Sequence, residues 1–190
     1  YTILEVEIPF IFSISFNGAR RTLVLESRPN AKVKVKFDGW GIINPLCGEF
    51  EVIEALNSYL DVQGIVRECE VGKEIKLNRG VSVPKRIRGI HANYQELPER
   101  LPDLSEVLVS YDEDGFELRI KGEGTYRVKP ETIGYYSVGA GDFLLGAYVS
   151  LREKGVKPLD AAREAQKLLE EFSTLGPGEW TRRRLGCSIV

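Results

Sequence analysis

The chain has 190 residues, 43% hydrophobic and 28% charged, which suffices for one well-buried α/β core and is short for two. A formal net charge of −2 excludes a general basic field for a nucleic-acid backbone, so a phosphorylated ligand would need a local anion site. No apolar run approaches the roughly 20 residues of a membrane span, so we expect no membrane partner. Residues 1–16 lack the basic start of a signal peptide.

Three cysteines, Cys47, Cys69 and Cys187, are odd in number, widely spaced and without a C-x-x-C pair. This pattern predicts neither a disulfide framework nor a zinc site, and it favours a reducing, cytoplasmic location. Abundant Glu, Lys, Arg, Val and Ile point toward a thermophilic source. Because the chain begins at Tyr1 and contains no Met, we expect it to be a fragment or to lack some residues of the whole protein.

Strand periodicity dominates the first 40 residues. Residues 10–16 alternate apolar and polar positions, Asn17-Gly18 is a strong hairpin signal, and residues 22–25 supply the returning strand. Residues 33–37 alternate valines and lysines, which predicts another strand with one solvated face.

A strand–helix–strand unit is predicted next. Residues 40–43 form a short apolar run that ends at Asn44-Pro45, which indicates a buried strand. Residues 49–59 have apolar positions at helical spacing, and residues 60–62 would be the next strand. Such a βαβ unit predicts a parallel sheet.

In the second half, strands are predicted at residues 88–92 and 107–111, with a helix that begins near Gln95. Residues 116–120 and 126–128 are expected to form an antiparallel pair across a glycine-containing turn.

Two helices close the chain, at residues 142–153 and 158–172, with Gly155 as the C-terminal cap of the first. The predicted fold is α/β, a mostly parallel sheet with helices on both faces. We expect a single domain over residues 1–190, with a hairpin and strand region in 1–37 and the core in 38–190.

The segment 137–144, Ser-Val-Gly-Ala-Gly-Asp-Phe-Leu, carries the chemistry. Gly139 and Gly141 lack a Cβ and precede a helix, so the backbone can approach a ligand there. The free N–H groups of a helix N-terminus form an anion site, and Asp142 beside them can accept a proton from a hydroxyl. These are two parts of a site for phosphoryl transfer.

Plainer interpretations of this segment remain open. Aspartate is favoured at helix N-termini on its own account, and Gly-Ala-Gly can be a tight turn. A dinucleotide-binding fingerprint is disfavoured because Leu144 stands where the third glycine is needed. Gly72-Lys73-Glu74 lacks the rest of a Walker loop.

Residues 137–144 resemble the second signature of the ribokinase-like (PfkB) carbohydrate and nucleoside kinases, Asp-Thr-x-Gly-Ala-Gly-Asp-x-Phe before a helix. The resemblance implies that Asp142 is the catalytic base and that the main chain of Gly139, Ala140 and Gly141 forms the anion hole.

The match has departures on either side. Ser137 replaces the family's Thr and Leu144 its Phe, while Tyr136 stands where the family usually has Asp.

Two further segments follow the family's order. Asn93-Tyr94-Gln95-Glu96 is similar to its Asn-x-x-Glu, which implies that Asn93 and Glu96 set the magnesium and phosphate geometry, Glu96 through water. The alternative, which the residues alone favour, is a helix N-cap at Asn93 with Glu96 in a capping box.

Residues 110–115 resemble the family's Thr-x-Gly-x-x-Gly, which implies nucleotide contacts at Ser110, Asp112 and Gly115. Asp112 replaces the first glycine, and its carboxylate would repel phosphate unless a cation intervenes.

The resemblance implies an ATP- and Mg²⁺-dependent kinase acting on a hydroxyl of a sugar, nucleoside or similar small molecule. Family members often form homodimers through a lid, so a homodimer is among the implied assemblies. The family's early substrate-binding units are not visible in this chain. Two alternatives are a degenerate kinase fold that binds nucleotide or a protein without chemistry, and a structural α/β domain with a glycine turn. His91, the single histidine, is interpreted as structural.

Overall fold

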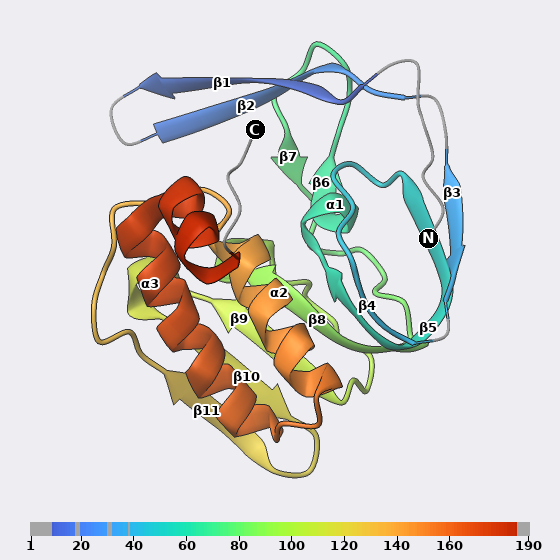
Figure 1. The fold of residues 1–190 in the computed structure, drawn as a ribbon. Coiled ribbons are helices and arrows are strands. Elements are labelled where there is room, and N and C mark those ends of the chain that lie inside the picture. Colours follow the sequence, from blue (N-terminus) through green and yellow to red (C-terminus); the bar gives the residue numbers. More distant parts are fainter. Residues whose placement is uncertain (1–8, 18–19, 30–31, 38, 186–190) are drawn as a thin grey trace.

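The computed structural model describes residues 9–17, 20–29, 32–37 and 39–185. Its central sheet has the strand order β11-β10-β9-β8-β5-β3, and β4 also pairs with β5 (Figure 1). The strands of this sheet are β3 (Val33–Lys36), β4 (Trp40–Ile43), β5 (Phe50–Asp61), β8 (Ile87–Asn93), β9 (Glu106–Ser110), β10 (Phe116–Ile120) and β11 (Gly124–Val128).

The sheet is mostly parallel, as predicted. β5 pairs in parallel with β3, β4 and β8, and β8 pairs in parallel with β9, whereas β9, β10 and β11 follow one another antiparallel. The carboxyl ends of β4, β5, β8 and β9 therefore meet at one edge of the sheet, which is where α/β folds usually bind ligands.

Two long helices, α2 (Ala140–Glu153) and α3 (Pro158–Leu185), lie side by side over one face of the sheet (Figure 1). They bury an apolar core, in which each fully buried large side chain contributes about 1.5–3 kcal/mol. The core includes Leu108, Phe116, Leu118, Leu144, Leu145, Tyr148, Val149, Ala161 and Ala165. Both predicted helices are confirmed, and α3 continues past a kink at Gly176, where the backbone leaves helical geometry (φ 76°, ψ 162°).

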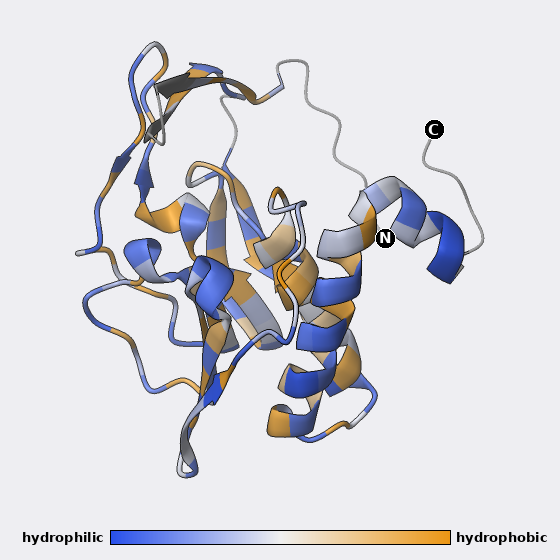
Figure 2. Cartoon of the chain, turned by 90° about the vertical axis from the view of Figure 1, so that its left-hand side faces the viewer, coloured by the Kyte–Doolittle hydropathy of each residue, from blue (hydrophilic) through white to orange (hydrophobic). Residues whose placement is uncertain are grey.

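A second apolar cluster occupies the other face of the sheet and is covered by α1 (Gln63–Val66) and irregular segments. Its members include Ile43, Leu60, Val62, Val66, Val83, Ile87, Ile90 and Leu104. Figure 2 shows the long helices on one side of the hydrophobic strands only. Within the described residues, helical cover of this second face is thus a single turn.

The helix predicted at residues 49–59 is wrong, and so is the βαβ unit built on it. These residues form β5, a 12-residue strand. Its backbone hydrogen bonds are taken up by β3 and β4 on the one hand and by β8 on the other. Such long-range pairing outweighs the helical spacing of the apolar residues. Residues 60 and 61, predicted as part of a separate strand, are the end of β5.

Two further predictions made from local sequence patterns are corrected in part. The helix expected near Gln95 is one 3₁₀ turn, Tyr94–Glu96. The strand at Trp40–Ile43 exists, but Ile42 is 41% exposed, so the strand is only partly buried. The antiparallel pair at β10 and β11 is confirmed.

The hairpin predicted near the start is confirmed by β1 (Ile11–Asn17) and β2 (Arg20–Ser27), which pair antiparallel with Asn17 opposite Arg20. Gly18, part of the predicted turn signal, lies outside the described residues. β2 rests on the loop between β6 (Arg67–Glu68) and β7 (Lys76–Leu77). No helix in the described part of the chain is long and apolar enough to cross a membrane.

Glu106 on β9 is a buried carboxylate, 2% exposed, with polar partners on β5, β8 and α2. Its carboxylate accepts hydrogen bonds from the hydroxyls of Tyr59 (2.5 Å) and Tyr148, and it pairs with Arg152 (2.8 Å) and Arg88 (3.2 Å). Burial alone would raise the pKa of Glu106, but the hydrogen bonds from Arg152 and the two tyrosines outweigh it and hold that pKa below its usual value.

We expect Glu106→Gln to lower the free energy of unfolding by about 3 kcal/mol at pH 7, because Arg152 loses its buried counter-charge. A carboxyl whose pKa is depressed in the folded state stabilises above its unfolded pKa, and that contribution is lost as pH falls through the folded value. The difference between wild type and variant in urea unfolding should therefore shrink below about pH 4.

The matched control is Glu117→Gln, which removes a carboxylate paired with Arg119 and Arg127 at the surface. It should cost under about 1 kcal/mol. Equal losses from both variants would contradict the role assigned to the buried network.

Candidate functional site

A cavity of about 870 Å³ opens at the carboxyl ends of the parallel strands. Asp61, His91, Asn93 and Ser110 line it from the ends of β5, β8 and β9, and the start of α2 faces them. The predicted site residues all line this one cavity: Asn93, Glu96, Ser110, Asp112, Gly115, Gly139, Ala140, Gly141 and Asp142. Sequence order alone left them up to 49 positions apart, so the sheet topology is what brings them together.

The start of α2 offers unoccupied backbone donors. Gly139 is the N-cap and has a left-handed φ of 78°, which turns the chain into the helix. The N–H of Ala140 bonds the carbonyl of Ser137 at 3.2 Å, and that of Phe143 bonds Gly139 at 2.8 Å. The N–H groups of Gly141 and Asp142 have no acceptor among the described residues.

Gly141 brings the first turn of α2 close to the sheet. A Cβ at this position would lie 3.0 Å from Cε1 of His91, a tight contact, so glycine lets α2 approach the sheet without moving the imidazole. The free N–H groups are thereby held directly above the ends of β8 and β9.

The Asp142 side chain is exposed and lines the cavity, and its one hydrogen-bond partner within the described part of the chain is Asn44. The Asn44 side-chain Nδ2 donates to Asp142 Oδ1 at 2.6 Å, and the Gln63 side chain donates to Asn44 Oδ1 at 2.9 Å. The sequence alone does not identify either amide as part of the site, because Asn44-Pro45 has the pattern of a strand end. Polar residues directly after predicted parallel strands were the available signal.

His91 is 4% exposed and bonded through both ring nitrogens. Nδ1 contacts Asp61 Oδ2 at 2.7 Å and Nε2 contacts the Ser110 hydroxyl at 2.8 Å. This geometry agrees with the structural interpretation of His91, and it ties Ser110 to the sheet edge.

The Asn93 side chain caps the 3₁₀ turn, accepting from the Gln95 N–H at 3.0 Å and donating to Asp112 Oδ1 at 3.1 Å. The N-cap interpretation of Asn93 is thus confirmed, but the capping box is wrong. Glu96 instead pairs with Arg67, whose Nε and Nη2 both reach its Oε1 at 3.0 and 2.9 Å.

Asp112 keeps a glycine-like backbone. Its φ of 50° is the one left-handed value at a non-glycine position in the described part of the chain. Such a conformation costs an L residue about 1–2 kcal/mol. At Gly115 a Cβ would lie 2.2 Å from the Val128 carbonyl oxygen, so glycine is required there by packing.

The outer wall of the cavity is fastened to α3. The Glu170 carboxylate accepts the N–H groups of Glu131 (3.1 Å) and Thr132 (3.2 Å), and the Tyr136 N–H bonds Ser173 at 3.0 Å. Gln166 lines the same cavity at 5% exposure, and its buried Oε1 has no hydrogen-bond partner among the residues that the structure describes.

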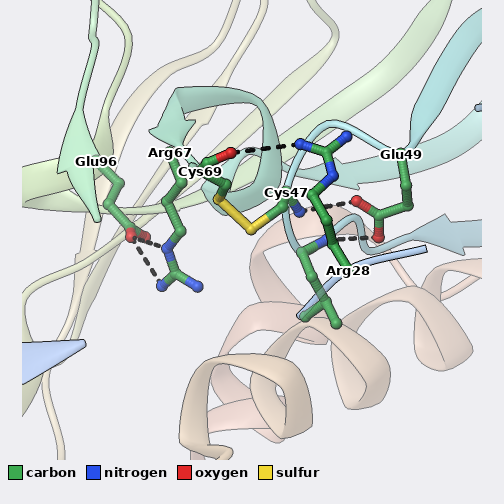
Figure 3. Close-up of a disulfide and its surroundings, with 7 residues drawn as sticks. Arg28, Cys47, Glu49, Arg67, Cys69 and Glu96 are labelled. Carbon is green, nitrogen blue, oxygen red and sulfur yellow. Dashed lines mark hydrogen bonds and ion pairs between the residues drawn. A yellow bond between two sulfur atoms is a disulfide. The ribbon is translucent and has the colours of Figure 1, made fainter. Parts of the chain in front are cut away.

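The prediction that the cysteines form no disulfide is wrong, because Cys47 and Cys69 are bonded (Figure 3). Counting cysteines and their spacing cannot detect a bridge that forms when β4 and β6 are brought together. The bridge fixes the loop after β4, in which the Glu49 carboxylate accepts the N–H groups of Leu46 (2.7 Å) and Cys47 (2.8 Å). Arg28 donates to the Cys69 carbonyl at 3.3 Å.

No group of three or more His, Cys, Asp or Glu side chains among the described residues is arranged to hold a metal ion. The carboxylates that line the cavity, Asp112, Glu113 and Glu96 among them, are nevertheless the hard oxygen donors that Mg²⁺ prefers.

No family model and no curated protein matches the sequence. Solved structures do match the fold. A pyrophosphate-dependent kinase of the ribokinase family, complexed with a pyrophosphate analogue and myo-inositol, gives a TM-score of 0.69 at 17% identity over 94% of this chain and 74% of that chain. Ribokinase from Thermotoga maritima gives 0.59 at 12% identity, over 90% of this chain and 64% of that one.

Ribokinase from Arabidopsis thaliana, complexed with ribose and ATP, gives a TM-score of 0.56 at 14% identity over 82% of this chain and 60% of that one. The chain therefore spans less than two thirds of the length of these two ribokinases. It has the ribokinase-like fold, which confirms at the level of fold the resemblance predicted from residues 137–144.

We expect Cys69→Ser to lower the free energy of unfolding by about 3 kcal/mol, because the bridge closes a loop across a sequence separation of 22 residues in the unfolded chain. Chemical unfolding under non-reducing conditions measures the loss. The double variant Cys47→Ser/Cys69→Ser should lose about as much as the single variant, since the first substitution already removes the bridge. A further loss of unfolding free energy in the double variant would show that each cysteine stabilises the fold by contacts other than the bridge.

Proposed function

We propose that this protein transfers a phosphoryl group from ATP to a hydroxyl of a sugar, nucleoside or related small molecule. The observation that carries the proposal is the juxtaposition at the start of α2. There, an exposed carboxylate at Asp142 stands beside backbone N–H groups that have no acceptor among the described residues.

The chemistry follows from this arrangement. Asp142 accepts the proton of the acceptor hydroxyl as its oxygen attacks the terminal phosphorus, and the bond from that phosphorus to the rest of the donor breaks. The N–H groups of Gly141 and Asp142 stabilise the negative charge on the transferring phosphoryl oxygens. The helix dipole of α2 adds to the same field.

Magnesium fits the site as a companion of the donor. Asp112 and Glu96 line the cavity with carboxylate oxygens, and Arg67 already neutralises part of the charge on Glu96. A Mg²⁺ ion would be held there through water rather than by a closed set of protein ligands. When bound, it supplies neutralisation of the donor phosphates.

The nucleotide assignments are proposals of the same kind. Ser110, Asp112 and Gly115 line the same cavity as the start of α2, which supports nucleotide contacts at these positions.

A second candidate donor is pyrophosphate. The solved structure with a TM-score of 0.69 is a pyrophosphate-dependent kinase of the ribokinase family. Because Asp112 and Glu113 also line the cavity, pyrophosphate, like ATP, would have to enter with cations. Comparing ATP and pyrophosphate at equal Mg²⁺ over a panel of sugars, inositols and nucleosides decides between them. Donor binding without turnover over the whole panel would favour the degenerate, non-catalytic alternative, for which the departure at Tyr136 argues.

We expect Asp142→Asn to lower kcat by about 10²–10⁴-fold, because the amide cannot accept the proton. The KM for the donor should stay nearly unchanged, since the backbone donors remain. Steady-state kinetics with the preferred donor and acceptor provide the measurement.

Asp160→Asn is the matched control, because Asp160 is likewise an exposed aspartate in the first turn of a helix, α3. It should leave kcat within about twofold. Wild-type turnover in Asp142→Asn would remove Asp142 from the mechanism.

A further inference from the structure

We infer that Asn44 is a positioning residue for Asp142, fixing one carboxylate oxygen so that the other is presented to the acceptor hydroxyl. This inference rests on the proposed function and deepens it. The Asn44 Nδ2 lies 2.6 Å from Asp142 Oδ1, and among the described residues this is the only hydrogen bond of the carboxylate. An exposed aspartate would otherwise sample several rotamers.

The orientation of the Asn44 amide is set by its other partner. An asparagine side chain can turn over, exchanging its donor and its acceptor. Here Gln63 Nε2 donates to Asn44 Oδ1 at 2.9 Å, so the oxygen must face Gln63 and the NH₂ group must face Asp142. The carboxylate of Asp142 and the NH₂ group of Gln63 thus both favour the same orientation of the Asn44 amide.

Gln63 is itself held by the edge of the sheet. Its backbone N–H donates to Asp61 Oδ1 at 2.9 Å, and Asp61 Oδ2 bonds His91 at 2.7 Å. His91 continues to Ser110. Hydrogen bonds thus connect Ser110, His91 and Asp61 to the backbone of Gln63, and the Gln63 side chain connects that backbone to Asn44 and Asp142.

The backbone that carries Asn44 is fixed as well. A Cβ at Gly64 would lie 2.2 Å from the Pro45 carbonyl oxygen, so the loop packs directly on α1. Cys47, three residues after Asn44, is bonded to Cys69. Asn44 thus projects from a braced loop, which is what a residue that orients a catalytic group requires.

The test uses substitutions at both amides. Asn44→Ala should lower kcat about ten- to a hundredfold with the donor KM within about twofold, because the carboxylate is misplaced while the anion site persists. Gln63→Glu should also lower kcat, because a carboxylate would draw the Asn44 NH₂ toward itself and turn its oxygen toward Asp142. Gln63→Leu, which removes the donor without reversing the amide, should have the smaller effect.

A double variant separates orientation from direct substrate contact. In the Asn44→Ala background, Gln63→Glu should cause little further loss, because no amide remains to be turned. Asn57→Ala is the matched control: Asn57 lies opposite Trp40, at the other end of the β4–β5 pair. It should keep kcat near wild type. Unchanged kcat in Asn44→Ala, or additive losses in the double variant, would overturn the inference.

A readout that needs no turnover keeps the inference distinct from the proposed function. The Asn44 side-chain amide proton resonances should shift in Asp142→Asn and in Gln63→Glu, and much less in Asp160→Asn. If the wild type transfers phosphate to no acceptor, the proposed function fails while these shifts still decide whether Asn44 holds Asp142. Resonances that are unchanged in Asp142→Asn would overturn the positioning role.

Discussion

The parallel pairing of β5 with β4 and β8 is the constraint on which the rest of the site depends. Because these strands run in the same direction as one another and as β9, their carboxyl ends share one edge of the sheet. Polar residues that follow different strands are thereby placed within hydrogen-bond reach, and α2 can start directly above them. Gly141 permits that approach, since a larger residue would meet His91. The position of the cavity is therefore set by the direction of the strands, and the side chains at the strand ends determine its chemistry.

Local signals in the sequence predicted the α/β class, the parallel sheet and the turn into α2. Gly139, Gly141 and Asp142 could be identified because a glycine turn before a helix has a direct physical meaning. The same local reasoning failed at β5, where apolar positions fit a helical period but the strand is held by pairing partners distant in sequence. Asn44 and Gln63 were missed for a related reason, because their value comes from contacts that only the assembled sheet creates.

The roles of Glu96 and of the two cysteines depend on residues that are distant in the sequence. Glu96 has the sequence position of a capping-box residue, yet its carboxylate forms a salt bridge with Arg67. Cys47 and Cys69 look like isolated thiols, yet the folded chain brings their Cα atoms to 5.6 Å. In both cases the competing interaction is long-range and stronger than the local alternative. Neither could be predicted from spacing along the chain.

The backbone at Asp112 has a consequence for how the cavity responds to its surroundings. Its φ of 50° lies in the left-handed region that glycine adopts freely, and its carboxylate adds negative charge to the lining of the cavity. Any polyanion that enters beside it must bring positive charge along. Occupancy of the cavity should accordingly rise with the concentration of free divalent cations as well as with that of the anion, which makes the site sensitive to ionic composition.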